Sequence, residues 1–312
     1  MISRRSGGGL AALAIALAAS VLVPALVACS SEIAGTPPST SGIKNTEFAL
    51  DNYRGLDMEV VEYALQIQSD KCMADAGYPQ NLQVDSSRPY PTTSVFVTDE
   101  SQFGLLSEDQ ARAKGFGQDP GWQPPKVASF DKNYDEVAEK CRGAGWRALG
   151  SGSEDLFRSY HDLGNELLLY REEVDRRLPE DLPAKMLTCI KRKGYQPADE
   201  QQFLQTPKPQ LLGIEFGQVE GGSEEWTPNP EPGTVQVDRA FSPGKYVPTP
   251  EEAKLAVAWY QCQQETGTTK ANRETIAAVQ REFVEKRAEA LTELNPKIEA
   301  LAKTAAQLVG KA

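Results

Sequence analysis

Cysteine is the residue type in this 312-residue sequence best suited to a specific chemistry, because paired thiols oxidise to disulfides and clustered thiolates bind zinc. Four of the five cysteines lie in the body of the chain, far apart in the sequence. Structural zinc ligands usually come in pairs separated by about two to four residues, so this spacing argues against zinc. In an exported protein, four such cysteines instead predict two disulfides. They are Cys72, Cys141, Cys189 and Cys262.

The single histidine, His161, lies close in sequence to Ser159 and Asp162, which are the other residue types of a serine-hydrolase triad. Such a triad is normally assembled from separate segments, whereas neighbouring residues on one helix point to different faces. We therefore expect His161 to be an exposed helix residue without a catalytic role. One histidine also excludes the zinc sites of the HExxH type, which need two.

Two further patterns resemble known ligand sites and fail at their decisive positions. The stretch from Asp131 begins like a calcium loop, but Glu136 replaces the required glycine and Arg142 replaces the final glutamate. Acidic residues at a helix N-terminus, where the helix dipole favours them, explain this run better. The stretch GFGQDPGW lacks the lysine of a phosphate-binding loop. We therefore expect neither a cofactor nor a metal site.

Acidic and aromatic residues leave two possibilities open. Paired carboxylates could hydrolyse a glycosidic bond, but the 44 acidic residues offer no means of choosing two. Trp122 and Trp226 lie in proline-rich stretches, where exposed rings could bind sugars or peptides, or could instead cover a small core. The net charge of −11 argues against a nucleic-acid partner, because an acidic surface repels phosphates.

The N-terminus predicts a location. Arg4 and Arg5 precede an uncharged apolar run at residues 10–23, which suits a secretory signal and is short of the roughly 20 residues that span a bilayer. The run leads into Leu-Val-Ala-Cys, which resembles the lipobox of bacterial lipoproteins. That resemblance implies that residues 1–28 are a signal peptide and that Cys29 is acylated and becomes the N-terminus. An ordinary signal peptide or an uncleaved anchor is the alternative.

An acyl anchor would hold the protein on the extracytoplasmic face of the cell membrane, because each buried CH₂ contributes about 0.8 kcal/mol. The membrane is then a partner through this anchor. Residues 29–45 are rich in Ser, Thr, Pro and Gly, which predicts a flexible tether. No later stretch is apolar enough to cross a bilayer.

Two stretches, KCMADAGYP at 71–79 and TCIKRKGYQP at 188–197, predict similar helix ends. Gly77 and Gly194 suit the left-handed position that follows a helix, where a residue without Cβ is not strained. The tyrosine after each glycine is then expected to fold back over the turn that carries the cysteine. The proline beyond it stops the helix.

The partner cysteines also match, because Cys141 and Cys262 each end an apolar stripe with helical spacing. We interpret the chain as two diverged repeat units, residues 46–150 and 151–268, with chance similarity as the alternative. Glycines that follow the stripes predict where these helices end: Gly143 or Gly145 in the first unit and Gly267 in the second.

All three pairings of the four cysteines are compatible with two repeats. We favour Cys72–Cys141 and Cys189–Cys262, because pairing within a unit would let each unit fold alone. Each bridge would close a loop of roughly 70 residues, which the chain-entropy model values at about 4 kcal/mol.

Each unit is predicted to contain a long helix, a proline-rich irregular insertion and a shorter helix. The insertions span residues 79–130 and 197–248, and β-like pieces such as TTSVFV and GTVQVD predict short strands within them. Thr249 and Glu252 match a capping box, with Pro250 at the first helical position.

Two apolar seams of alternating three- and four-residue spacing predict helices that pack on one face. The residues from 269 to 312 form an amphipathic helical segment, in which Pro296 should start a new helix or kink the old one. Both helices could cover the core of the protein, or the C-terminal one could dock an envelope or transporter protein. The seams are Leu156, Tyr160, Leu163, Leu167, Tyr170 and Val174, and Leu291, Leu294, Ile298, Leu301, Ala305 and Leu308.

The pattern of Cys72, Met73, Gly77 and Tyr78 resembles a group of secreted, mostly uncharacterised actinobacterial proteins with Cys-Met, three residues, Gly and an aromatic at a helix end. The second copy departs from it, with Ile190 in place of methionine. The resemblance implies a location in the cell envelope and carries no catalytic residues.

The sequence thus predicts a mainly α fold with minor β (α+β). The leading functional interpretation is a non-catalytic binding or accessory module of the cell envelope, anchored as a lipoprotein. The alternative is an envelope-polymer hydrolase with paired carboxylates. A two-lobed binding protein for a transporter would need βα alternation, which is missing.

Overall fold

The computed structural model describes residues 47–311, except for 83–87, 93, 95–97, 99–103, 106, 223–225 and 239–242. The predicted signal peptide, Cys29, the tether and most of the stretch TTSVFV lie outside the described residues. Within the described ranges, no helix has both the length and the apolar character that crossing a bilayer requires.

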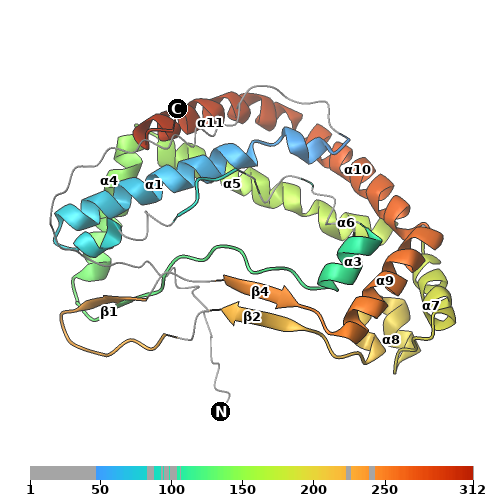
Figure 1. Ribbon diagram of the computed structural model, residues 1–312. Helices are drawn as coiled ribbons and strands as arrows, with labels where there is room; N and C mark the ends of the chain where they lie inside the picture. Colours follow the sequence, from blue (N-terminus) through green and yellow to red (C-terminus); the bar gives the residue numbers. More distant parts are fainter. Residues whose placement is uncertain are drawn as a thin grey trace, which may run out of the picture.

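The predicted mainly α fold with minor β is confirmed (Figure 1). The helices are α1 (Gly55–Asp75), α3 (Glu108–Lys114), α4 (Tyr134–Leu149), α5 (Ser153–Leu168), α6 (Tyr170–Arg177), α7 (Leu182–Arg192), α8 (Glu200–Gln205), α9 (Pro250–Glu265), α10 (Thr268–Lys286) and α11 (Ala288–Leu308). Short 3₁₀ helices are η1 (Ala49–Asn52), η2 (Pro79–Asn81) and η4 (Pro209–Leu212). The strands form two antiparallel pairs: β1 (Val127–Ser129) with β3 (Val235–Val237), and β2 (Gln218–Gly222) with β4 (Pro243–Val247).

The larger hydrophobic core lies between α1, α4, α5, α6, α10 and α11. In Figure 1, α11 and α1 run side by side above α5. Both predicted seams face this core, so the expectation that these helices cover the protein's own core is confirmed. Their buried members are Tyr160, Leu163, Leu167, Tyr170 and Val174, and Leu291, Ile298, Leu301 and Ala305, while Leu156, Leu294 and Leu308 are partly buried.

Hydrogen bonds tie the C-terminal helix to the start of the described chain. The hydroxyl of Tyr160 donates to the Asn295 side chain, and Asn295 donates to the carbonyl of Asn52 at 3.2 Å. Tyr53 stacks on Tyr160 with ring centroids 4.5 Å apart. Of the two alternatives for Pro296, the start of a new helix is wrong, because α11 begins at Ala288 and runs through the proline. A kink at Pro296 stays a prediction.

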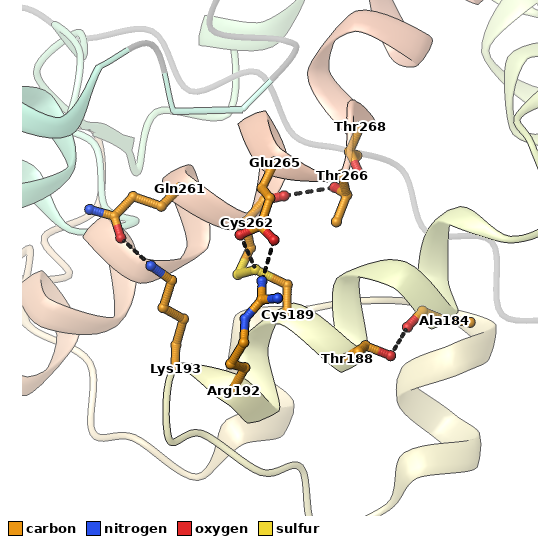
Figure 2. The surroundings of a disulfide bond; sticks show 10 residues. All are labelled: Ala184, Thr188, Cys189, Arg192, Lys193, Gln261, Cys262, Glu265, Thr266 and Thr268. Atoms are coloured by element: carbon orange, nitrogen blue, oxygen red, sulfur yellow. Dashed lines mark hydrogen bonds and ion pairs between the residues drawn. A yellow bond between two sulfur atoms is a disulfide. The ribbon is translucent and has the colours of Figure 1, made fainter.

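A second core lies between α7, α8, α9 and η4 and contains the Cys189–Cys262 disulfide. Figure 2 shows this bridge, with Cα atoms 5.7 Å apart, between α7 and α9. Beside it, the Arg192 guanidinium forms an ion pair with the carboxylate of Glu265. This pair is exposed, so it adds little to the free energy of unfolding. The Cys72–Cys141 disulfide joins α1 to α4 in the same way, with Cα atoms 5.4 Å apart.

The two matching helix ends have the predicted geometry. Gly77 and Gly194 have φ angles of 104° and 93°, and the N–H of the tyrosine after each donates to the carbonyl of Met73 or Ile190, at 2.9 and 3.1 Å. These bonds satisfy carbonyls that a helix end leaves without an intrahelical partner. The ring of Tyr78 packs with Met73 in a small core around the first disulfide, as expected.

The two insertions are exchanged between the units, which the sequence did not predict. Helix α3 comes from the first unit but packs on α9 of the second, where Ala111 is fully buried (Figure 1). Strand β3 comes from the second unit but pairs with β1, and its Val235 and Val237 pack near Tyr134 in the core around the first disulfide. The predicted disulfide pairing is present, and each unit contributes an element that packs with the other unit, so the two units are not self-contained in this structure.

Helix α4 continues through both glycines that were expected to end it and stops before Gly150. The physical reason is close packing at Gly145. A Cβ atom there would lie 2.9 Å from Leu65 Cδ1 and 2.9 Å from Ser69 Oγ, both on α1. Gly145 therefore serves the close approach of two helices instead of a helix end. The other predicted end is confirmed, because Gly267, with a φ of 73°, follows α9.

The predicted helix start at Thr249 is confirmed, since its hydroxyl accepts the N–H of Glu252 at 3.0 Å. The carboxylate of Glu252 does not complete a capping box. It is fully buried and accepts the N–H groups of Phe116 and Gly217, both at 2.7 Å, and the hydroxyl of Tyr246. Glu252 thus fixes the segment after the exchanged α3 and the β2–β4 strand pair to the start of α9.

Candidate functional site

A cavity of about 800 Å³ lies between α1 and α4, and it is the strongest candidate for a binding site in the described part of the chain. The two helices form its long walls, because the disulfide and the close contact at Gly145 hold them together. Asn81 of η2, the segment with Arg88, Pro89 and Pro91, Trp122 and β1 line it further. Cavities of this volume are in the range that binds small ligands.

One wall of the cavity is polar and consists of buried side chains. The Asp70 carboxylate, from α1, accepts the side-chain amides of Asn81 at 2.9 Å and Gln66 at 2.7 Å. Asp70 is 1% exposed and Asn81 is fully buried. A buried polar group without a partner costs free energy, so the amides that hold Asp70 are part of what keeps this wall folded.

Two polar atoms of this wall are buried without a hydrogen-bond partner among the described residues: Asn81 Oδ1 and the Tyr134 hydroxyl oxygen. Burial raises the pKa of Tyr134 to about 12, and the neighbouring Asn81 amide offsets part of that rise. The hydroxyl is therefore protonated at neutral pH. A group that binds in the cavity could satisfy both atoms, since a carbonyl oxygen accepts and a hydroxyl both donates and accepts.

An aromatic ring lies at the margin of the cavity. Trp122 is 37% exposed, and the Arg88 guanidinium lies 5.4 Å from the centroid of its ring. Trp122 therefore lies at the margin of the candidate site, and binding of sugars or peptides by its ring stays a prediction. Trp226 is only partly exposed and does not line this cavity.

Charged side chains of both signs surround the polar wall. Glu59 and Glu62 come from α1, while Asp135, Glu139 and Arg142 come from α4. Glu139 and Arg142 form an ion pair at 2.7 Å. Glu62 keeps solvent access, but the crowded wall around it removes enough water to raise the pKa of its carboxyl, and His161 lowers it in part. The sequence offered no means of choosing two catalytic carboxylates among its acidic residues. The structure brings several acidic side chains together in the lining of this cavity.

The predicted exposure of His161 is confirmed. Its Nδ1 lies 3.0 Å from the side-chain amide of Asn165, one turn along α5. The Ser159 hydroxyl donates to the backbone carbonyl of Asp155, so it is not directed at the imidazole. These residues form no nucleophile and base pair.

The calcium-like stretch has structural roles. Asp131 accepts the N–H of Asn133 at 2.9 Å and the hydroxyl of Tyr78 at 3.0 Å. Asp135 and Glu136 occupy the first turn of α4, where the helix dipole favours negative charge. In the described ranges, no three His, Cys, Asp or Glu side chains lie close enough to hold a metal ion.

Asp70 and Asn81 are the residues of this site that the sequence analysis missed. Asp70 had a weak signal, because it lies on the same face of α1 as the buried Met73, where a charge is unusual. Asn81 had none, since it follows Pro79 in a short turn and is placed only by tertiary packing.

Comparisons with known proteins do not assign this cavity to a family. No protein-family model matches the chain, and no curated protein or solved structure is significantly similar to it.

Proposed function

We propose that this chain is a lipoprotein, anchored on the extracytoplasmic face of the cell membrane, which acts as a non-catalytic binding module of the cell envelope. The observation that carries the binding function is the cavity between α1 and α4, in which Asn81 Oδ1 and the Tyr134 hydroxyl are buried without a partner. In native proteins such atoms are rare, and a ligand that pairs with them is a physical reason to keep them.

Two features support the location. The Leu-Val-Ala-Cys motif that ends at Cys29 follows a charged and then apolar N-terminus in the order of a lipoprotein signal. The two disulfides suit an oxidising compartment outside the cytosol, where such bonds persist. The acyl chains on Cys29 would then be the contact with the membrane.

Fractionation of cells that express a Cys29→Ser variant tests the anchor. The variant should move from the membrane fraction to the soluble fraction, because the sulfur that carries the acyl group is lost. A Ser30→Ala variant changes the adjacent residue and should stay with the membrane. Retention of the Cys29→Ser protein in the membrane fraction would contradict the anchor.

Hydrogen exchange of the full chain, with and without a soluble extract of the host envelope, tests the binding function. We expect slower exchange in peptides from residues 66–81 and 134–142, which line the cavity, and no change in α9. Exchange that is unaltered at the cavity would refute binding there.

The alternative function, hydrolysis of an envelope polymer, is favoured by one observation: the raised pKa of Glu62 among the carboxylates of the cavity. A carboxyl with a raised pKa is suited to protonate the leaving oxygen of a glycosidic bond, while a second carboxylate acts as base or nucleophile. The test is whether the protein releases labelled fragments from host polysaccharide. Release that is lost in a Glu62→Gln variant and kept in a Glu136→Gln variant, whose substitution lies outside the cavity, would establish this alternative. Absence of release from the wild-type chain leaves the binding module.

A partner protein at the C-terminal helix remains a prediction. The apolar face of α11 packs in the larger core, through Ile298 and Ala305. An envelope or transporter protein would therefore have to contact the exposed charged face, which carries Lys297 and Glu293.

A further inference from the structure

The hydrogen-bonding capacity of the cavity restricts the chemistry of its ligand, if the binding function proposed above is correct. Asn81 Oδ1 is only an acceptor, while the Tyr134 hydroxyl both donates and accepts. An ammonium group could donate to both atoms but would leave the Tyr134 proton without an acceptor. A carboxylate or phosphate could accept from Tyr134, but it would leave Asn81 Oδ1 unpaired and would lie near the Asp70 carboxylate, which repels it.

A hydroxyl group satisfies both atoms at once, because it donates to the Asn81 carbonyl and accepts from the Tyr134 hydroxyl. The rest of the lining agrees with a ligand that has several hydroxyls and no net charge. Carboxylates at Glu59 and Glu62 accept hydrogen bonds, while the amide of Gln66 donates them. Five acidic side chains and two arginines line the cavity, so the wall has a net negative charge that repels an anion. A cation is disfavoured only by the proton of Tyr134, which it would leave without an acceptor.

The exposed ring of Trp122 adds an apolar surface beside these polar groups. A flat ring that carries C–H groups on its faces and hydroxyls on its edge can stack on an indole and still use the polar wall. We infer that the cavity between α1 and α4 binds the ring of a neutral sugar, with its hydroxyls paired to Asn81 and Tyr134 and one face against Trp122. The sugar can be a free saccharide or a unit of an envelope polysaccharide or glycolipid.

Isothermal titration of the full-length chain, kept in a detergent without sugar groups, tests this inference. The probes are neutral saccharides of one to three rings, purified wall polysaccharide and vesicles that contain a glycolipid, with putrescine and succinate as cationic and anionic comparisons. Binding of saccharides alone points to a free sugar, while binding only of the polymer or the vesicles points to an envelope component; either supports the inference. Binding of putrescine or succinate without any sugar-containing probe, or no binding at all, would overturn it.

Variants assign the binding to the cavity. Trp122→Ala should weaken binding about tenfold through loss of stacking, and Tyr134→Phe should weaken it about three- to tenfold through loss of one hydrogen bond. Trp226→Ala is the control and should bind like the wild type. Equal affinity of all three variants would overturn the assignment. If the envelope extract slows hydrogen exchange at the cavity but no sugar-containing probe binds, only the inference of a sugar ligand is refuted. If the extract leaves hydrogen exchange unchanged and no probe binds, the proposed binding function itself is refuted.

Discussion

The contact between α1 and α4 predicts opposite effects for two alanine substitutions in the same helix. At Gly145, an added Cβ would lie 2.9 Å from Leu65 Cδ1 and 3.1 Å from the Leu65 carbonyl. At Gly143, the nearest atom outside the helix backbone is the end of the flexible Arg147 side chain, at 3.4 Å. Both substitutions gain about 1 kcal/mol of helix propensity, because alanine is the better helix former.

Overpacking a well-packed contact costs about 1–3 kcal/mol, and the backbone of α1 cannot move aside as a side chain can. The cost at Gly145 should therefore exceed the gain, so Gly145→Ala should lower the free energy of unfolding by about 1 kcal/mol. Gly143→Ala should raise it by about 1 kcal/mol. In a protein of this size the difference of about 2 kcal/mol between the two variants corresponds to roughly 3–4 °C in melting temperature.

Thermal unfolding followed by circular dichroism, with urea unfolding as a second measure, gives both values. Gly143→Ala is the matched control, since it has the same change in composition and helix propensity. Equal stability of the two variants would refute the role of Gly145 in holding the cavity walls together.

Replacing Cys72 and Cys141 together by alanine should lower the free energy of unfolding by about 4 kcal/mol, measured in urea under non-reducing conditions, and peptide mapping of the wild type should find this bridge. Deletion of residues 295–312 should abolish cooperative unfolding, because it removes buried core side chains; a folded truncated chain would contradict their place in the core. The free energy of unfolding should fall between pH 10 and 12, because unfolded tyrosine loses its proton near pH 10 while Tyr134 keeps its proton up to about 12. Tyr134→Phe should reduce that fall, as measured by urea midpoints at pH 9 and 11.5, and an unchanged slope would be evidence against burial of this hydroxyl. His161→Ala should leave folding and binding intact, and a selective loss of binding would reveal a role for the imidazole.

Local signals explain what could be predicted from the sequence. The helix ends at Gly77 and Gly194 depend only on a few neighbouring residues. The local pattern of cysteine, glycine and tyrosine is therefore sufficient to predict where each helix stops. The seams that face the larger core were also predictable, because the spacing of apolar residues along a helix determines which face is buried. The spacing alone thus predicts the burial of Ile298 and Tyr160, which are both fully buried in the structure.

Tertiary contacts explain what could not be predicted. Gly145 looked like a helix end because glycine is common there, but the closeness of α1 gives it a different role. Glu252 fitted a capping box, yet its carboxylate binds N–H groups from segments far away in the sequence. The cavity depends on the juxtaposition of Asn81 with Tyr134, and no spacing rule relates a residue in a turn to one in a later helix.

The exchange of α3 and β3 between the units has a consequence for the order of assembly. Synthesis proceeds from the N-terminus, so β1 emerges roughly a hundred residues before the strand that pairs with it. Cys72 and Cys141 can form their disulfide before β3 has been synthesised. Until then the partly synthesised chain exposes the unpaired edge of β1 and the apolar side chains that β3 later covers. A cut between the halves would leave two fragments that each lack a piece of their interior, so neither half of this molecule should survive as an independent product.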